Sequence, residues 1–377
     1  MMGSTFFVLA LAAALAAPPP PGAAPTGPSF TVGFVGDVSF AGQRGRPEDV
    51  FAGVREVLSR PDLTVCNVEG LLLAGGAPKY GEARLDISAN PRWAAAFGAS
   101  GIDLLGTANN HSWDAGAAGV LEHLGHLEGT GLPVLGIGRR SAEASAEVAA
   151  RAPRRIQSSV GCLSIVPATL KSNRPADRGE AQAHDKAGPV AAVAWYSSDD
   201  DTRPGQRPLS DLLALVRTER AAGCAPIVSI HWGREGKPRP DRQVIAVGDA
   251  LVEAGAALVV GHHPHVLQGF EWRGDAAIAW SLGNFVFANR DPDKRRTGLL
   301  EARFASAMGA SPGDVASTAG APRLVELAFT PMTIASETFT PRLATPRELG
   351  PHRDAAKARS DDLDVVPDGT RWILRAR

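Results

Sequence analysis

Short apolar runs that end abruptly in polar residues organise the chain between about residues 30 and 285. These runs are rich in Val, Ile and Leu. They read "FTVGFV" at 30–35, "LTVC" at 63–66, "IDLLGTA" at 102–108, "PIVSI" at 226–230, "AALVV" at 256–260 and "AAIAW" at 276–280. Runs so short and so uniformly apolar are typical of β-strands buried on both faces. The pattern therefore predicts a set of core strands.

Stretches with helical periodicity lie between these runs, at 48–58, 91–98, 115–127, 209–221 and 242–254. The last two are followed by Gly223 and Gly255, and glycine is favoured where a helix ends. Strands that alternate with helices predict an α/β fold. In such folds, ligands collect beyond the carboxyl ends of the strands.

A polar cluster follows each apolar run, at the place where an α/β fold would bind a ligand. The clusters supply carboxylate, amide and imidazole groups: Asp37, Glu69, Asn110, His111, His231, His263 and His265. This ligand set suits Zn, Mn, Fe or Ni. No cysteine belongs to it, which disfavours a closed structural zinc site. The sequence predicts an open centre that polarises a substrate oxygen and activates water.

Each cluster also has an explanation that involves no metal. A Gly-Asp pair after a strand is often a turn, and Asn-Asn-His can form an Asx turn. A histidine just after a strand can be satisfied by a backbone carbonyl, and we assign His262 to this class. The recurrence of such clusters at strand ends favours one shared site. Two cations there would need a bridging carboxylate, from Glu69 or Asp37.

The remaining segments are less regular. Residues 171–210 and 306–322 are rich in Ala, Gly, Ser, Pro and charged residues, which predicts long loops. Residues 323–335 and 338–345 have β-type composition and predict strands packed on the main domain. Residues 346–377 form a weakly patterned tail with one apolar closure at 372–374. No internal repeat is evident.

The N-terminus predicts export. Residues 1–17 contain an apolar run from Phe6 to Ala17, which is shorter than the roughly 20 residues of a membrane span. Small residues at 14–16 suit signal-peptide cleavage, although no Lys or Arg precedes the run. Residues 18–29 predict a Pro-rich linker. We expect a periplasmic, envelope or extracellular protein with no integral membrane span after cleavage. The alternatives are an uncleaved anchor and a mis-started N-terminus.

Composition excludes some partners and reactions. A net charge of −1 gives no reason to expect a nucleic-acid partner, and 44% hydrophobic with 21% charged residues is a soluble globular balance. There is no Gly-x-Ser-x-Gly elbow. A "GIGRRS" segment has Ser141 in place of the third glycine of a dinucleotide loop. Cys66, Cys162 and Cys224 are far apart in apolar segments, so we expect small buried side chains, with one disulfide as the alternative.

Seven segments together resemble one family. They read "GFVGDVSF", "NVEG", "ANNHSWDAG", "GIGRRSAEA", "SIHWGREGKPRPDRQ", "GHHPHVLQG" and "WSLGNFVF". In this order and spacing they are similar to the CapA family of capsule synthesis proteins. That family is associated with poly-γ-glutamate synthesis, anchoring or export, and it resembles the calcineurin-like metallophosphoesterases. The resemblance implies a four-layer αββα sandwich with two mixed sheets over residues 30–345, with the motifs in 30–290 and a β-rich part at 296–345.

The resemblance also implies roles for the site residues. Metal would be held by Asp37, Glu69, Asn110, His231, His263 and His265, and the catalytic set would be His111, Asp37 and His231. His111 would lie near the leaving group, and Glu69 would stand where the superfamily has a bridging aspartate. Two departures concern the second metal. Ser39 replaces the histidine of the usual Asp-x-His, and the bridge is one methylene longer. We therefore expect one or two divalent ions.

Residues near these motifs have supporting roles in this interpretation. Arg234 and Glu235 are the candidate substrate-binding residues, because the basic residues around Glu235 can hold carboxylates or phosphates. For Lys237 and Arg239, a solvated loop is the favoured alternative. Asp114 and Asn284 are expected to orient the metal ligands and His111. Core packing or capping is the alternative for both.

Three functional hypotheses follow from the sequence. The first is an exported metal-dependent hydrolase or transferase acting on a phosphoester or a γ-glutamyl-type amide. The second is a non-catalytic scaffold in an envelope polymer-synthesis complex. The third is a polyglutamate-binding component that uses Arg234 and its neighbours. The expected partner is an anionic polymer or phosphoester.

Overall fold

The computed structural model describes residues 27–75, 87–173, 191–198, 206–307, 320–358 and 362–377, with residues 184–185, 188–189, 202 and 360. The predicted signal peptide at 1–17 and most of the linker at 18–29 lie outside the described residues. So do large parts of the loops predicted at 171–210 and 306–322. No helix in the described ranges is long and apolar enough to cross a membrane.

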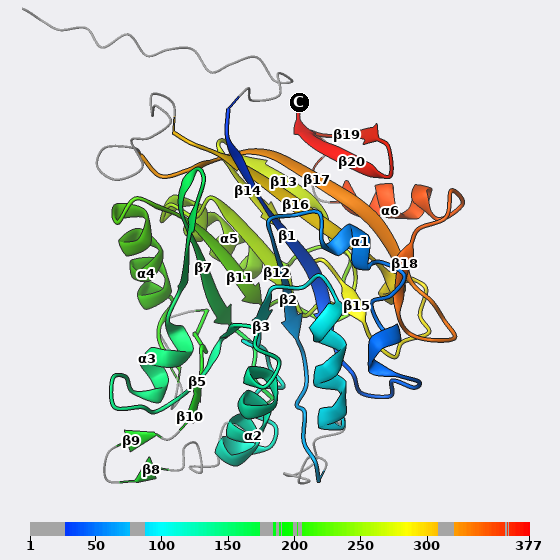
Figure 1. Ribbon diagram of the computed structural model, residues 1–377. Helices are drawn as coiled ribbons and strands as arrows, with labels where there is room; N and C mark the ends of the chain where they lie inside the picture. The colour runs from blue at the N-terminus through cyan, green and yellow to red at the C-terminus, as the bar shows by residue number, and fades with distance from the viewer. Residues whose placement is uncertain are drawn as a thin grey trace, which may run out of the picture.

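The larger sheet is built around the first strand (Figure 1). Its order is β19 (Leu363–Asp368), β20 (Arg371–Ala376), β17 (Arg323–Ile334), β16 (Arg296–Ala305), β1 (Ser29–Val38), β2 (Leu63–Val68), β3 (Leu104–Gly106) and β4 (Val134–Leu135). In addition, β15 (Asn284–Val286) pairs with β1, and β18 (Pro341–Leu343) pairs with β17. Strands β15, β1, β2, β3 and β4 pair in parallel, whereas β16, β17 and β20 pair antiparallel. The sheet is therefore mixed.

The smaller sheet has a parallel centre and antiparallel edges. Its order is β13 (Phe270–Arg273), β14 (Ala276–Ala279), β12 (Leu258–His262), β11 (Cys224–His231), β7 (Gly161–Thr169) and β6 (Arg154–Ser158). Two short pairs stand apart: β5 (Ile137–Arg139) with β10 (Ala191–Val193), and β8 (His184–Asp185) with β9 (Gly188–Pro189).

The helices follow the prediction in part: those predicted at 115–127, 209–221 and 242–254 are confirmed, the stretch at 91–98 is a 3₁₀ helix instead, and the helix at 146–151 was not predicted. The helices are α1 (Arg55–Leu58), α2 (Gly116–Glu128), α3 (Ala146–Arg151), α4 (Leu209–Ala221), α5 (Arg242–Glu253) and α6 (Leu349–Ala356), with the 3₁₀ turns η1 (Pro47–Asp49), η2 (Pro91–Ala99) and η3 (Asp293–Arg295). The N-terminus of α5 is capped by Asp241, whose carboxylate accepts the backbone N–H of Val244 at 3.0 Å. The helix predicted at 48–58 is instead η1 and α1 separated by turns, and the low helix propensity of Gly53 between them favours this break.

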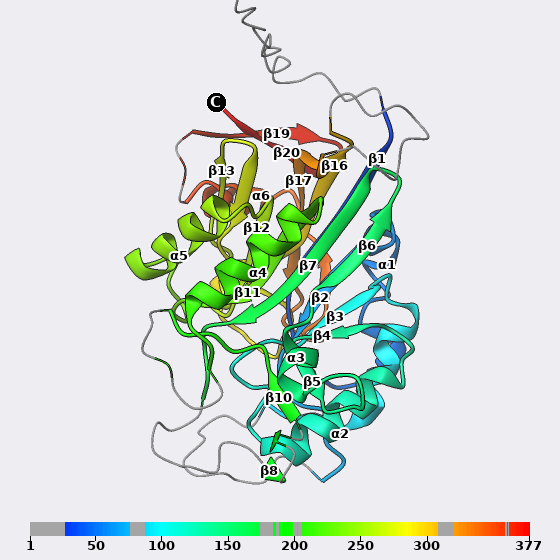
Figure 2. The same cartoon turned by 90° about the vertical axis from the view of Figure 1, so that its left-hand side faces the viewer.

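The two sheets face each other across one apolar layer, and helices cover their outer faces. Phe34 and Val65 of the larger sheet share a core with Ile227 and Val260 of the smaller sheet. Helices α4 and α5 cover the other face of the smaller sheet (Figure 2). The turns and short helices around η1 and η2 cover the larger sheet, with Trp93 in that core. The αββα sandwich expected from the sequence is therefore confirmed.

Two parts of the fold go beyond the sequence prediction. Strand β7 lies between β6 and β11. Its sequence "GCLSIVPAT" contains Ser164 and Pro167, which are unusual in a central strand, so the sequence did not predict it. The C-terminal tail, where only one apolar closure was evident, forms α6, β19 and β20 and extends the larger sheet. Trp372 and Leu374 of that closure are buried in the core between the sheets.

The expectation of three separate buried thiols is wrong for two of them. Cys162 and Cys224 form a disulfide. They stand directly opposite each other at the starts of β7 and β11, which pair in parallel. Sequence spacing could not show this register, because the two cysteines are 62 residues apart. Cys66 is buried and free, as expected.

Candidate metal centre

The polar clusters predicted from the sequence meet at one edge of the sandwich. Asp37 lies near the end of β1, Glu69 directly follows β2, and His231 ends β11. Asn110 and His111 follow β3, while His263 and His265 follow β12. Every one of these residues is at most 7% exposed. Parallel strands that end on the same side explain how distant segments meet here.

Close packing explains the glycine that precedes Asp37. A Cβ atom at Gly36 would lie 2.1 Å from the carbonyl oxygen of Gly283. The N–H of Asp37 donates to that same oxygen at 2.9 Å. The Gly-Asp pair is therefore part of a strand end that packs against the loop before β15, and it is not a turn.

Two groups of potential metal ligands share Glu69. One group is Glu69, His231 and His263, and the other is Asp37, Glu69 and His265. Within each group the ligand atoms lie within 4.8 Å of one another. Glu69 Oε1 is 3.9 Å from His231 Nε2 and 3.7 Å from His265 Nε2. Asp37 and Glu69 were both candidates to bridge two cations. Glu69 is the one that belongs to both groups.

Asn110 extends the first of these groups. Its Oδ1 atom lies 2.7 Å from Nε2 of His231. The Nδ1 atom of His263 lies 3.1 Å from the same Nε2. One amide oxygen and two imidazole nitrogens therefore meet beside the Glu69 carboxylate, which is a suitable set for a borderline divalent cation.

The carboxylate of Glu69 has no hydrogen-bond partner on either oxygen within the described part of the chain, although both oxygens are buried. A buried, unpaired polar group costs folding free energy, and a buried unpaired charge costs more. A cation between Glu69 and the imidazoles would satisfy both oxygens. The residues present therefore fit a metal ion.

The electrostatics of the site also favour a cation. Burial, together with the nearby carboxylates of Asp37 and Glu235, raises the pKa of Glu69 well above its ordinary value. Burial and the neighbouring imidazoles lower the pKa of His231 well below its ordinary value, and they lower the pKa of His263 to about 3. The imidazoles of His231 and His263 are therefore neutral at pH 7, with lone pairs available for a metal.

Asp37 is held by partners from two other segments, the end of β2 and the end of β12 with the loop that follows it. Burial alone would raise its pKa, but the hydrogen bond with His262 and the charges of His262 and His265 lower it. Asp37 accepts hydrogen bonds from the Asn67 amide at 2.8 Å and from the His263 backbone N–H at 3.2 Å. His263 and His265 have positive φ angles of 94° and 56°, which are uncommon for residues other than glycine. The backbone bond to Asp37 helps to hold this loop.

Both predicted orienting residues contact the groups they were expected to support. Asn284 Oδ1 lies 2.7 Å from His265 Nδ1, which leaves His265 Nε2 on the side of Glu69. Asp114 lies 2.6 Å from His111 Nδ1, and His111 Nε2 lies 3.8 Å from Glu69 Oε1. Such partners fix the orientation and the tautomer of an imidazole.

Three further residues of the site were missed or misjudged in the sequence. His262 belongs to the site, because its Nδ1 lies 3.1 Å from Oδ1 of Asp37. Asn67 joins Asp37 to the cluster, and its position two residues before Glu69 on the same strand end was the available signal. Asn173 donates to Asp114 and lies 3.1 Å from His111 Nδ1. It lies at the start of the irregular segment 171–210, which gave no signal.

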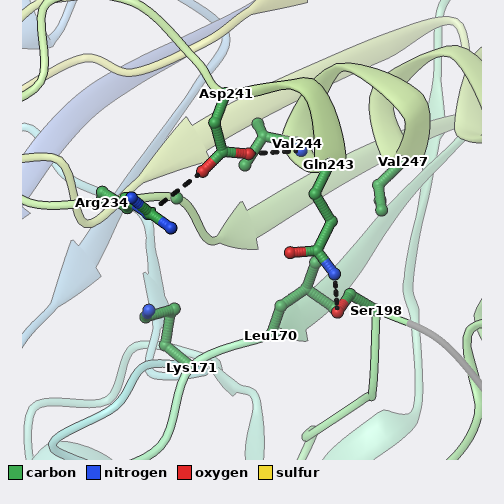
Figure 3. Close-up of a pocket in the computed structure, with 9 residues that line it drawn as sticks. Leu170, Lys171, Ser198, Arg234, Asp241, Gln243, Val244 and Val247 are labelled. Atoms are coloured by element: carbon green, nitrogen blue, oxygen red, sulfur yellow. Dashed lines mark hydrogen bonds and ion pairs between the residues drawn. The ribbon is translucent and has the colours of Figure 1, made fainter.

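The two candidate substrate-binding residues point in different directions. The Arg234 side chain is 74% exposed and pairs with Asp241 at 3.6 Å. It lines a pocket of about 310 Å³ beside the centre. Figure 3 shows Arg234 and Lys171 on one side of this pocket and the hydrogen bond between Gln243 and Ser198 on the other. Glu235, in contrast, lies with the ring nitrogens of His263 and His265.

Comparison with known proteins agrees with the motifs. Residues 31–289 match the family described as bacterial capsule synthesis protein PGA_cap. The chain is 29% identical over 246 residues to the capsule biosynthesis protein CapA of Bacillus anthracis, covering 63% of this chain and 53% of that protein. It is 26% identical over 263 residues to the PGA biosynthesis protein CapA of Bacillus subtilis, covering 67% and 62%.

A more distant relative is a probable polyglutamine synthesis accessory protein of Mycobacterium tuberculosis. It is 28% identical over 182 residues, covering 48% of this chain and 43% of that protein. The chain thus spans roughly half of the length of these curated relatives. The family match covers more than half of the chain, and with it the whole of the candidate centre. This chain belongs to the PGA_cap family of bacterial capsule synthesis proteins and is a CapA-like protein.

Proposed function

We propose that this protein is an exported, metal-dependent hydrolase or transferase of envelope polymer synthesis, acting on a phosphoester or a γ-glutamyl-type amide. The relatives are named for capsule, PGA and polyglutamine synthesis. Its partners would be an anionic polymer or phosphoester and the complex that makes or exports the polymer. The observation that carries the proposal is the buried Glu69 carboxylate, which has no hydrogen-bond partner on either oxygen among the described residues and lies beside the imidazoles of His231, His263 and His265.

One or two divalent ions, of Mn, Zn, Fe or Ni, would be held by Asp37, Glu69, Asn110, His231, His263 and His265. A cation there would supply a Lewis acid for a substrate oxygen and would make water a better nucleophile at neutral pH. The protein contributes the fixed ligand positions and a largely dry surrounding, which strengthen the electrostatic interactions within the site.

His111 is suited to deliver a proton to the leaving group. Its Nδ1 lies against Asp114 at 2.6 Å, so its Nε2 is turned toward Glu69 and the centre. Asn173 contacts the same Nδ1 and further restricts the ring. A positioned imidazole of this kind typically contributes about 10²–10⁴-fold in rate.

The pocket beside the centre is suited to an anionic substrate. Lys171 and Arg234 provide positive charge, and Gln243 and Ser198 provide hydrogen-bonding groups (Figure 3). Lys171 is close enough to His263 to contribute to its lowered pKa. A carboxylate or phosphate of the substrate could therefore bind here while an adjacent bond lies at the centre.

Export is supported by the disulfide between Cys162 and Cys224. Disulfides persist in oxidising compartments and are rare in the cytosol of most organisms. This agrees with the signal peptide proposed for residues 1–17. Purification of the protein from a periplasmic or extracellular fraction, with the N-terminus determined by sequencing, tests the proposal.

Turnover tests the proposed activity. The protein, loaded with Mn²⁺ or Zn²⁺, is assayed with bis(p-nitrophenyl) phosphate and with γ-glutamyl p-nitroanilide. We expect turnover of at least one substrate, and a decrease of about 10²-fold or more in His231→Ala, because a metal ligand is lost. His126→Ala is the matched control, since His126 lies on α2 and pairs only with Glu122 among the ion pairs of the described residues. Circular dichroism verifies that both variants fold.

A second candidate function is a scaffold that binds metal without turnover. Ser39 favours it, because this position carries no imidazole; its Oγ accepts the Ala41 backbone N–H at 3.5 Å. Stoichiometric metal binding together with no turnover of either substrate would support the scaffold. Turnover that is lost in His231→Ala would exclude it.

A further inference from the structure

The loop after β11 brings an exposed carboxylate to the buried imidazoles. Glu235, His263 and His265 form a third group whose ligand atoms lie within 4.8 Å of one another. Glu235 is exposed, whereas His263 and His265 are 5% and 7% exposed. The carboxylate of Glu235 therefore reaches the centre from an exposed loop.

The backbone around Glu235 is attached to the segment that carries both imidazoles. The N–H of Gly236 donates to the carbonyl of Pro264 at 2.8 Å. The side-chain amide of Gln268 donates to the carbonyl of Lys237, also at 2.8 Å. Both bonds lie directly after Glu235, so they hold its loop against the segment that carries His263 and His265.

Basic neighbours do not account for the position of Glu235. Arg234 pairs with Asp241. Across the part of the chain that the structure describes, no ion pair joins Glu235 to a lysine or an arginine. The carboxylate of Glu235, although surrounded by basic residues in sequence, therefore lies with the ring nitrogens of His263 and His265.

The centre has a place for one more ligand. The group of Asp37, Glu69 and His265 offers three side chains, and Ser39 offers no imidazole to it. Two divalent cations would carry four positive charges against the two negative charges of Asp37 and Glu69. A third carboxylate improves this balance, and carboxylate oxygens are ordinary ligands for zinc and manganese.

We infer that Glu235 is a direct metal ligand, supplied by the loop after β11 in place of the imidazole that the first motif lacks. This inference rests on the metal centre of the proposed function and deepens it. Glu235 changes from the substrate-binding residue expected from the sequence to part of the metal site. The anionic substrate is then left to Lys171 and Arg234, which line the adjacent pocket.

Metal affinity tests the inference without any assay of activity. Binding of Mn²⁺ and Zn²⁺ to the full chain is measured by titration calorimetry and by metal analysis, for the wild type, Glu235→Gln and Glu253→Gln. Glu253 is an exposed carboxylate at the end of α5, so its substitution removes the same charge far from the centre. We expect Glu235→Gln to weaken binding of one metal equivalent by about 10–100-fold, and Glu253→Gln to leave it unchanged.

Ionic strength separates a ligand from a distant charge. Loss of a direct ligand weakens binding similarly at 50 mM and 500 mM salt, whereas a long-range charge effect is screened at high salt. Unchanged affinity in Glu235→Gln, or a loss that disappears at high salt, would overturn the inference while leaving the metal centre intact. If the wild type binds no metal, the inference and the proposed function fail together. The thermal unfolding of each variant in EDTA verifies that it folds.

Discussion

At the scale of single residues, the contribution of Glu69 to folding stability depends on whether a cation binds beside it. It is almost fully buried and its oxygens have no partner among the described residues, while Asp37 stands close by. Without a cation, ionised Glu69 opposes folding. With a cation, the same charge becomes the shared ligand of the two groups.

Glu69→Gln should therefore change the free energy of unfolding in opposite directions without and with metal. In EDTA at pH 8 we expect the variant to be more stable than the wild type. Because burial raises the folded-state pKa of Glu69 above the ordinary 4.5, the wild type loses stability as the pH rises above 4.5, so the difference grows with pH. With saturating Mn²⁺ the wild type should be the more stable. Denaturation with urea at several pH values measures both differences, and an unstable variant in EDTA would contradict the argument.

A second residue prediction concerns acid stability away from the centre. Burial, with the nearby His126, lowers the pKa of His123 to about 3, and its Nδ1 accepts the Leu72 N–H at 3.0 Å. Below pH 6.5 the unfolded chain binds a proton that the folded protein excludes. Stability should therefore decrease by about 1.4 kcal/mol per pH unit for this group as the pH falls from 6.5 toward 3.

His123→Asn tests this contribution, because an amide oxygen can accept the same N–H without titrating. We expect a shallower decrease of the unfolding free energy between pH 6.5 and pH 5 in this variant than in the wild type, measured in EDTA. His126→Asn removes the neighbouring imidazole, whose effect on the pKa of His123 is secondary to burial, and should change the slope less than His123→Asn. Equal slopes for His123→Asn and the wild type would show that His123 does not cause the loss of stability at acid pH.

The sequence predicted which side chains come together at this edge of the sandwich, because each of them follows an apolar run. Asp37 and His231 lie at the ends of strands, and Glu69 directly follows one. The apolar runs in the sequence identify all three strands. The partners of these groups were harder to predict, because they depend on three-dimensional contacts. His262 looked like an ordinary buried histidine, and only the approach of β12 to β1 brings it to Asp37. Asn173 depends on a loop conformation that no periodicity encodes.

At the scale of elements, helices with a clear end signal could be predicted from the sequence, whereas the pairing and register of the strands could not. Helices α4 and α5 were recognised because their apolar faces are regular and a glycine follows each. Strand β7 was missed because Pro167 and Ser164 interrupt it, although neighbouring strands cover it on both sides. Its pairing with β11 also determined the disulfide, which no spacing rule could have given.

The disulfide gives a prediction at this scale. It joins the beginnings of two central parallel strands and closes a long loop, so its removal should cost about 2–4 kcal/mol. We expect the double variant Cys162→Ser and Cys224→Ser, or the reduced wild type, to unfold at lower urea concentration. Thiol titration in guanidinium without reductant should find one free thiol, that of Cys66. Three free thiols in the exported protein would show that the bond does not form.

At the scale of the whole molecule, the candidate centre joins the two halves of the sandwich. Asp37, Glu69 and Asn110 come from the strand ends of the larger sheet, whereas His231, His263 and His265 come from the smaller sheet. The two sheets are otherwise held together by the apolar layer between them. A cation at this edge therefore adds a bond between layers, at the place where strand ends leave the core.

Metal should consequently stabilise the molecule as a single unit. At 100 times the dissociation constant, binding to the folded state alone contributes about 2.7 kcal/mol. We expect Mn²⁺ or Zn²⁺ to raise the midpoint of one cooperative thermal transition, and EDTA to reverse the shift. His265→Ala removes a ligand from the smaller sheet only, yet it should reduce the shift for the entire molecule, while His126→Ala should retain it. If metal instead stabilised only one of two separable transitions, the ions would be held within one sheet, and the centre would not join the layers.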